Sequence, residues 1–599
     1  MATVTDALIR EAIPEAWHVR PAELTASGQH RLTYARIREA HRTLPRISEL
    51  LADPWAYCAV LERAAVIDPW LFHPLLLHYT LTTAPVLRFG DPQRTSGLLD
   101  ALESLSVTGC AAMTEASRSN SHLELRTTAT HDPARGGFVL HTPDASAVKK
   151  PVMAAHAGGG KLAAVYARLV VGGADCGVFV FAVPLRGADG RAVPGVRIQP
   201  MVENSLLTAD FSTVAFDHVR LPAESWLDDG ARIEDGVFHD PAGDVAARLR
   251  RTMSIGPGVW RGISAMAAAV SRSAAVMALR YSMQHTTTGR LAPELPLIGY
   301  RTQRNAVFTA LATAWAATVA AEHAKGRRDA ARTGGSTGSD GSAGTASSAG
   351  ATWAPWSSVD QELALVKVIT TELADRVLDR CRRHCGSSGT LETDHLNRYR
   401  GLIQGYATAG GDNQLILLDT GRALAEAPER SPLRTPAGAS PAEAGLALES
   451  CRELARVAES LLQRRLRGRV VDSLRRGEDR FTAWNRELEL TLDTATAACD
   501  RLLLDLAAAA LGRAAGPDTV FGEDALFGED TPAVLGALAT VFALDWAERR
   551  CGLLSDLGLL SPGELGRIRA AREVGCDVLL PHAERLAAAY GPPAGLLIS

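Results

Sequence analysis

The sequence predicts a mostly helical α+β protein with an N-terminal helical domain, a β-barrel-like middle domain, a helical bundle and a second, C-terminal helical domain. Three observations predict this class. Apolar residues recur at three- and four-residue spacing through most of the chain, which indicates helices. Between about 109 and 235 they give way to short runs rich in Val, Thr and Phe, broken by Gly, Asp and Pro, which indicates strands. At 599 residues the chain is also too long for a single hydrophobic core.

The first two predicted domains span residues 1–108 and 109–235. The first is predicted to be helical because apolar side chains recur at helical spacing in stretches such as 47–61 and 98–105. In the second, near-continuous apolar runs indicate buried strands, and Ala-Asp-Gly-Arg at 188–191 indicates a turn. The predicted strands include 137–141, 163–171 and 176–183.

Helical patterns return after the β domain and define two more predicted domains, 245–425 and 442–599. Within the former, a tract at about 326–352 is rich in Gly, Ser, Ala and Thr. We predict a disordered insertion there, because so few apolar side chains cannot offset the entropy lost on ordering. A proline-containing loop at 428–441 separates the two domains. The helices predicted in the middle domain span 245–324, 359–384 and 414–425.

Composition excludes several classes of function. The net charge is only −4, from 63 basic and 67 acidic residues, so no global field recruits nucleic acid or an anionic membrane. The nine cysteines form no CxxC pair, which favours reduced thiols in a cytoplasmic setting. Cys381 and Cys385 lie four apart on a predicted helix without further ligands, so we expect packing and no metal site. We also expect no signal peptide and no membrane span, because no uninterrupted apolar run reaches about 18 residues.

Several motifs occur at the spacing of one enzyme family. Residues 109–115 read Gly-Cys-Ala-Ala-Met-Thr-Glu, residues 216–222 read Phe-Asp-His-Val-Arg-Leu-Pro, and residues 408–415 read Thr-Ala-Gly-Gly-Asp-Asn-Gln-Leu. These resemble blocks of the acyl-CoA oxidases and acyl-CoA dehydrogenases. Because the order of domains and the extra C-terminal helices are similar to the peroxisomal-type oxidases, the chain is identified as a divergent member of that branch. Further matching blocks are 126–132, 138–143 and 165–169.

The resemblance implies an FAD-dependent oxidoreductase of fatty acid metabolism that acts on an acyl-CoA or acyl-carrier-protein thioester. In the family, a glutamate removes the α-proton of the thioester and the β-hydride passes to the flavin. By this correspondence Thr114 contacts FAD, and Arg261, in Gly-Val-Trp-Arg at 258–261, lies near the thioester. The resemblance also implies a homodimer, or a heterodimer with a related oxidase.

The residues expected to carry the chemistry depart from the family pattern. Gly410 stands at the position of the catalytic glutamate, and glycine has no side chain that accepts a proton. Lys150 stands where a tryptophan packs on the flavin ring, and a cation does not replace that aromatic surface. His285 stands where an arginine reaches the flavin diphosphate, and imidazole is a weaker, pH-dependent phosphate partner. Thr114, Lys150 and His285 are therefore the candidate cofactor-binding residues, with FAD occupancy left open.

A turn next to the flavin motif has also changed. Ser117 and Ser119 replace two glycines, which adds Cβ atoms where the family backbone approaches the cofactor closely. Arg118 and His122 in the same stretch are candidates for meeting an anion.

No catalytic residue is assigned. Asp412, Glu392 and His395 are candidate substitute bases, although each is more simply a loop hydrogen-bonding group or a helix cap. The stretch 245–251, where some dehydrogenases place their base, contains no carboxylate.

Three functions remain open from the sequence. The chain is an acyl-thioester oxidoreductase with a relocated base, or a non-catalytic subunit that pairs with an intact oxidase paralogue. Alternatively, it is a flavin enzyme with different, oxygenating chemistry that needs no α-proton base.

Overall fold

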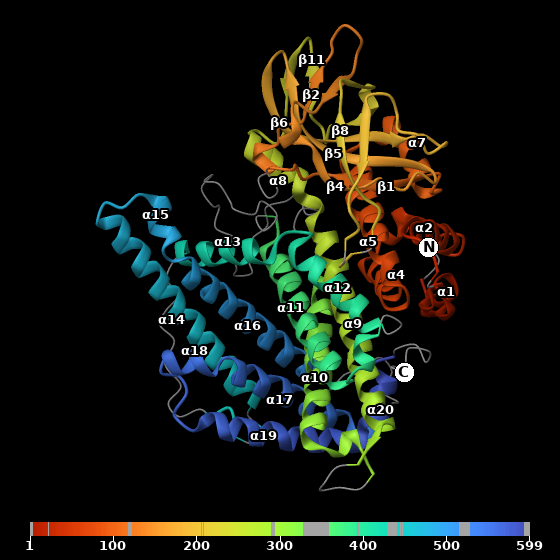
Figure 1. The fold of residues 1–599 in the computed structure, drawn as a ribbon. Coiled ribbons are helices and arrows are strands. Elements are labelled where there is room, and N and C mark those ends of the chain that lie inside the picture. The colour runs from red at the N-terminus through yellow and green to blue at the C-terminus, as the bar shows by residue number, and fades with distance from the viewer. Residues whose placement is uncertain are drawn as a thin grey trace. The chain divides into compact units, whose positions relative to one another are not determined.

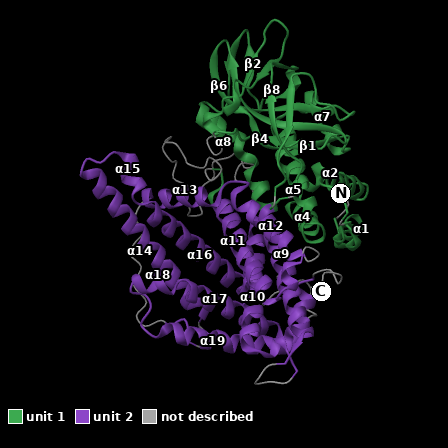
Figure 2. Ribbon diagram, in the orientation of Figure 1, with its two compact units in different colours: residues 1–262, 328–335, 349–361 green, residues 263–327, 336–348, 362–599 purple. Residues whose placement is uncertain are grey.

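The chain divides into two compact units (Figures 1 and 2). Unit 1 contains Met1–Gly262, Arg328–Gly335 and Ala349–Gln361; unit 2 contains Ile263–Arg327, Ser336–Ser348 and Glu362–Ser599. The insertion predicted at about 326–352 lies outside the described residues, apart from its first two positions. The computed structural model describes residues 4–21, 23–117, 122–204, 206–207, 209–288, 294–327, 359–391, 395–427, 440–443, 445, 447–513 and 527–591.

Unit 1 begins with a set of helices, three of which start at an Asp-Pro pair. Asp53, Asp68 and Asp91 each accept hydrogen bonds from backbone N–H groups of the first turn, and the proline that follows has no N–H to satisfy. The apolar pattern at 47–61 is divided between two helices by the first of these pairs. The helices are α1 Asp6–Ala12, α2 Ala26–Ala40, α3 Ile47–Ala52, α4 Pro54–Ile67, α5 Pro69–Leu76, α6 Ala84–Phe89 and α7 Pro92–Glu103, with a π-helical turn at Leu77–Thr83.

Asp68 also joins the first helices of unit 1 through buried charge. Its carboxylate accepts hydrogen bonds from Arg20 (2.8 and 2.6 Å) and from Arg36 on α2 (2.7 Å). All three side chains are buried. Because both guanidinium groups depend on one carboxylate, this cluster connects α2 and the segment before it to the start of α5.

The β domain follows at once, as the sequence predicts. Its large sheet has the strand order β10-β6-β5-β2-β3-β9, with β1 parallel to β5, and a second sheet has the order β4-β8-β7. The predicted strands at 137–141, 163–171 and 176–183 are confirmed as parts of β3, β5 and β6. The strands are β1 Val107–Ala112, β2 Thr128–His131, β3 Phe138–His141, β4 Lys149–Met153, β5 Gly160–Val171, β6 Ala174–Arg186, β7 Val196–Pro200, β8 Phe211–Phe216, β9 Val219–Leu221, β10 Trp226–Leu227, β11 Arg232–Glu234 and β12 Val237–His239.

The continuous helical pattern predicted for 245–324 is wrong in its middle. The structure has α8 Val245–Thr252, α9 Gly256–Gln284 and α10 Arg301–Gly326. Between the last two lies a small hairpin, β13 Thr286–Thr287 with β14 Leu295–Pro296. The run of β-branched threonines and the two prolines at 293 and 296 explain the break, because neither favours a helix interior.

The rest of unit 2 is helical. The predicted helices at 359–384 and 414–425 are confirmed as α11 Gln361–His384 and α13 Asn413–Glu426, whereas α12 His395–Thr408 was not predicted. α13 lies so close to α16 that a Cβ on Gly421 would meet the Thr491 carbonyl oxygen at 2.3 Å. The remaining helices are α14 Ala447–Arg475, α15 Arg480–Asn485, α16 Leu488–Arg513, α17 Thr531–Arg549, α18 Cys551–Asp556, α19 Glu564–Leu579 and α20 Ala583–Ala589.

One stretch of the described chain, Val245–Gln284, is long and apolar enough to cross a membrane by length and composition. Within the fold, 94% of its most apolar window is buried. Buried core helices pass the same test, so this is weak evidence for a span.

We predict that Asp68→Asn lowers the stability of α2 and α5 by about 3–5 kcal/mol, because it leaves two buried guanidinium groups without a counter-charge. Native-state hydrogen exchange of the α2 and α5 amides measures the effect. The control is Asp6→Asn, whose partner Arg10 is 62% exposed and whose loss costs no more than about 1 kcal/mol. Equal changes in both variants would contradict the role given to Asp68.

Candidate active site

The predicted flavin-contacting residue Thr114 follows the end of β1 and is half-buried. Its carbonyl oxygen accepts a hydrogen bond from the backbone N–H of Lys150 (3.0 Å), so the structure brings two of the predicted site residues together through their backbones. The Lys150 side chain itself is exposed.

A buried ion pair fixes the strands that carry these two residues. The Lys149 ammonium donates to Glu115 Oε1 (3.0 Å), to the Met113 carbonyl oxygen (3.1 Å) and to the Tyr166 carbonyl oxygen (2.8 Å). Burial lowers the pKa of Lys149 to about 8, against the opposing effect of Glu115. Burial also disfavours the charged form of Glu115, but Lys149 and two backbone N–H groups outweigh it and hold the pKa of this carboxyl below its ordinary value. The pair is therefore ionised at neutral pH and rigid.

The altered turn after this pair is only partly described. Ser117 is exposed, and its backbone N–H donates to the Ser146 carbonyl oxygen (3.2 Å). Burial lowers the pKa of His122 to about 4, so its imidazole is neutral at physiological pH and offers no charge to an anion. Arg118 and Ser119 lie outside the described residues.

In unit 2, Gly410 lies in the short connection between α12 and α13. Gly410 and Gly411 have φ of +68° and +91°, the left-handed region that side chains other than glycine rarely adopt. Asp412 caps α13 by accepting from the backbone N–H groups of Gln414 (2.9 Å) and Leu415 (3.3 Å). This carboxylate is thus engaged as a helix cap, the simpler of the two roles considered for it.

A buried lysine holds the same connection. The Lys367 ammonium on α11 donates to the Gly411 carbonyl oxygen (2.6 Å) and to Asn413 Oδ1 (2.8 Å). Burial lowers the pKa of Lys367 to about 7, although Asp412 and Glu372 favour its charged form. The Gly-Asp-Asn part of the family motif therefore has a structural role that is independent of catalysis.

Two further candidate bases are His395 and Glu392, and the structure describes only His395. His395 opens α12 and is buried, with its ring against Tyr399 at 5.5 Å between centroids. Glu392 lies outside the described residues.

His285 lies at the end of α9 and is turned back on its own helix. Its ring stacks on Tyr281 with 3.9 Å between centroids, and its Nδ1 lies 3.0 Å from the Tyr281 carbonyl oxygen. Its carbonyl oxygen accepts from the Leu297 N–H (2.8 Å). The imidazole is therefore positioned by local contacts rather than extended like the arginine of the family.

The loop after α11 keeps the two glycines that its backbone requires. Gly386 has φ of +59°, and a Cβ on Gly389 would meet the Arg382 carbonyl oxygen at 2.5 Å. Ser387, between these glycines, has an ordinary helical φ of −66° and causes no strain. Cys381 and Cys385 beside this loop are buried and form no disulfide.

A feature that the sequence did not predict is a cavity of about 990 Å³ within unit 1. Arg261, the predicted thioester-binding residue, is one of four arginines among the described residues that line it, and these include one acidic residue, Asp229. The four positive charges and one negative charge leave the lining at +3. The arginines are Arg88, Arg250, Arg251 and Arg261.

These arginines differ in the groups to which they donate hydrogen bonds. Arg251 donates to Asp229 (2.6 Å), and the same carboxylate accepts from the buried Arg248 (2.8 Å). Arg88 donates to a neutral acceptor, the Ser254 carbonyl oxygen (3.0 Å). Apolar side chains form much of the remaining wall, among them Leu51, Leu87, Phe89, Ile255 and Val359, together with Ser48, Thr80 and Ser254. The cavity therefore suits a ligand with an anionic part and an apolar part.

Part of this cavity has a signal in the sequence. Arg250 and Arg251 lie next to each other in α8. Arg88 lies on α6, far earlier in the chain, and donates to Ser254, which is 166 positions later. The tertiary fold therefore brings Arg88 to the same cavity as the arginines of α8.

Comparison with known proteins gives the same family as the motifs. Residues 259–425 match the model of the acyl-CoA oxidase C-alpha1 domain. The family model, the sequence relatives and the solved structures all support a divergent relative of the acyl-CoA oxidases. It is 27% identical over 377 residues to acyl-coenzyme A oxidase 2, peroxisomal, of Arabidopsis thaliana, a match that covers 61% of this chain and 52% of that protein. The chain thus spans about half the length of this relative.

Solved acyl-CoA oxidases share the fold. Acyl-CoA oxidase 1 of Yarrowia lipolytica has a TM-score of 0.75 at 20% identity, covering 97% of this chain and 85% of that one. Acyl-CoA oxidase-1 of Caenorhabditis elegans, complexed with FAD and ATP, has a TM-score of 0.71 at 17% identity, covering 98% and 91%. The predicted fold class is confirmed by this likeness, whereas the roles assigned to single residues stay predictions.

We predict that Gly410→Glu, which restores the family carboxylate, destabilises the connection between α12 and α13 by about 1–2 kcal/mol because of its positive φ. Hydrogen exchange of the amides at 405–415 measures the loss. The control is Gly468→Glu in α14, where an added Cβ meets nothing within 4 Å beyond the backbone of its own helix. Replacing glycine by another residue inside a helix stabilises that helix by up to about 1 kcal/mol. Unchanged exchange in Gly410→Glu would show that the connection adapts without strain.

Proposed function

We propose that this chain is an acyl-CoA oxidase-like protein that binds an acyl thioester on a phosphate-bearing carrier, CoA or the prosthetic arm of an acyl carrier protein. The observation that carries the proposal is the arginine-lined cavity of unit 1. Arginines recognise phosphates through charge-assisted hydrogen bonds, and the apolar wall suits an acyl chain. Its volume of about 990 Å³ lies at the upper end of the usual range for small-molecule sites.

Proton abstraction by the family route is not part of this proposal. Gly410 has no side chain that can accept a proton, and the Asp412 carboxylate accepts hydrogen bonds from two backbone N–H groups of α13. A lost general base typically lowers the rate about 10²- to 10⁴-fold. In this proposal the chain binds the thioester, and desaturation requires a base other than the residue at position 410, supplied by this chain or by a partner.

FAD is the cofactor that the family implies, but the residues at its predicted contacts do not fit it. Lys150 presents an exposed cationic side chain where aromatic surface is needed, and His285 is stacked on Tyr281. We therefore derive no step through a flavin. These departures favour the second candidate function, a non-catalytic subunit that pairs with an intact oxidase paralogue.

Binding of a long-chain acyl-CoA, measured by titration calorimetry, tests the thioester site. We expect Arg250→Ala and Arg261→Met each to weaken binding roughly tenfold to a hundredfold, because each removes a charged partner worth about 1.5–3 kcal/mol. Arg191→Ala is the control, since that side chain is 89% exposed on a turn away from the cavity. Equal affinity in all variants, or none in the wild type, would refute the site. Replacing acyl-CoA by an acyl-phosphopantetheine separates the two carriers.

The visible flavin absorbance of the purified chain tests the choice between candidate functions. We expect a colourless protein when the chain is expressed alone, and flavin only when it is co-expressed with a related oxidase. Stoichiometric flavin in the chain expressed alone would count against the non-catalytic subunit. Bound flavin that no acyl thioester bleaches would instead favour oxygenating chemistry.

A further inference from the structure

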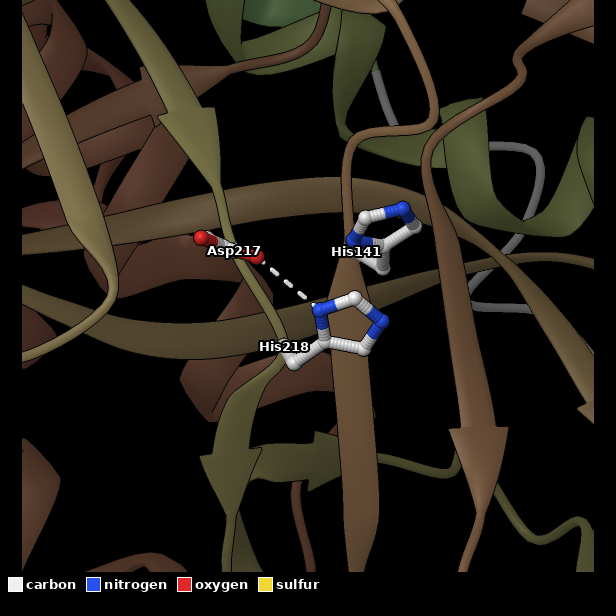
Figure 3. Close-up of side chains that lie close together, drawn as sticks. All are labelled: His141, Asp217 and His218. Carbon is white, nitrogen blue, oxygen red and sulfur yellow. Dashed lines mark hydrogen bonds and ion pairs between the residues drawn. The ribbon is translucent and has the colours of Figure 1, made fainter.

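A cluster of metal-ligating side chains lies on the β domain, apart from every residue of the proposed thioester site. His141 ends β3, and Asp217 and His218 form the connection from β8 to β9 (Figure 3). β3 and β9 are antiparallel with Leu140 opposite Val219, so the next pair along the ladder sets His141 opposite His218. The two rings stack with 4.0 Å between their centroids.

The connection that carries Asp217 and His218 is fixed over β3. Thr142 next to His141 donates its backbone N–H to the Phe216 carbonyl oxygen (2.8 Å), and its hydroxyl accepts the Phe216 N–H (3.0 Å). His218 has φ of +50°, an uncommon conformation for a side chain larger than glycine. The cluster is therefore held by backbone hydrogen bonds rather than by the mutual attraction of its side chains.

One nitrogen of the cluster has no protein partner. His141 Nδ1 is buried from solvent and makes no hydrogen bond. Such an atom costs about 1–3 kcal/mol unless a ligand satisfies it. His218 Nδ1 donates to Asp217 Oδ1 (2.9 Å), and Arg197 lies 3.7 Å from the other oxygen of this exposed carboxylate.

We propose that His141, Asp217 and His218 bind a divalent transition-metal ion, with zinc as the representative. One nitrogen or oxygen from each residue lies within 4.8 Å of the others. Tetrahedral zinc with ligands at about 2.1 Å sets them roughly 3.4 Å apart, so small side-chain rotations close the site. Two imidazoles and a carboxylate suit zinc, copper or nickel, whereas magnesium and calcium favour oxygen ligands alone.

Binding requires a free lone pair on each ligating nitrogen. When Nδ1 of neutral His218 binds the metal, its proton moves to Nε2 by exchange with solvent, and a metal–nitrogen bond replaces the N–H···O hydrogen bond to Asp217. The exposed position of Asp217 and His218 leaves the fourth coordination position to water. Because β9 is the edge strand of the large sheet, the ion fastens that edge to β3. The role is structural and does not depend on the proposed function.

The test uses the full chain without an affinity tag, stripped with a chelator and titrated with zinc chloride by calorimetry. We expect His141→Gln and His218→Asn each to weaken this zinc site at least tenfold, since even outer-shell changes cost about 10- to 100-fold. Asn is chosen at 218 because it tolerates a positive φ. His131→Asn is the matched control, a histidine on β2 of the same sheet that is outside the cluster.

Two further readouts keep the result decisive. Cobalt bound to the wild type should give visible ligand-field absorption that both cluster variants lose and the control keeps. Zinc should also raise the thermal transition of the wild type but not that of the variants. No zinc binding by the wild type, or binding that the cluster variants leave unchanged, would overturn the site. Binding only at millimolar zinc would equally overturn it.

Discussion

The buried ammonium group of Lys149 makes the hydrogen bonds on which the segment around Thr114, the predicted flavin contact, depends. It joins β1, β4 and β5 at one buried charge, and Glu115 extends the constraint by accepting the N–H groups of Arg126 (2.9 Å) and Thr127 (2.9 Å). A buried charge without its partner is strongly destabilising, so these contacts leave little freedom. The backbone that presents Thr114 is consequently fixed whatever side chain follows Lys149. The backbone around Thr114 thus keeps its position without an aromatic side chain at residue 150.

Lys367 has the corresponding role in unit 2. Its two hydrogen bonds to the segment after Gly410, together with the Asp412 cap, account for each residue of the motif that the chain retains. The glutamate of the family is the member whose role is proton transfer, and it is the member that is missing. In both places the contacts that hold the backbone are present, whereas Lys150 and Gly410 depart from the family pattern. Thr114 and Arg261 still match that pattern.

The sequence predicts the fold class and the confirmed strands because both rest on local periodicity and on motifs with fixed spacing. It fails where tertiary packing decides. The sequence does not predict α12, because the segment that begins at His395 resembles a loop of the family. Leu396, Tyr399 and Tyr406 nevertheless follow helical spacing. The cavity joins Arg88 to arginines more than 150 positions later, and the metal cluster joins the ends of two paired strands. The spacing of residues within a single segment cannot reveal either of these groupings.

Binding and chemistry are physically separable in a protein that acts on acyl thioesters. Holding the carrier requires cations and holding the acyl chain requires apolar surface, whereas removing the α-proton requires one acceptor within hydrogen-bond reach. The cavity of unit 1 meets the first two requirements with a lining charge of +3, and its one carboxylate, Asp229, is already shared by Arg248 and Arg251. Hydrogen bonds from two guanidinium groups occupy the oxygens of this carboxylate, so it is not positioned to accept a proton from a ligand. Among the described residues of the lining, groups suited to hold a thioester are thus present, and the carboxylate beside them serves to hold arginines.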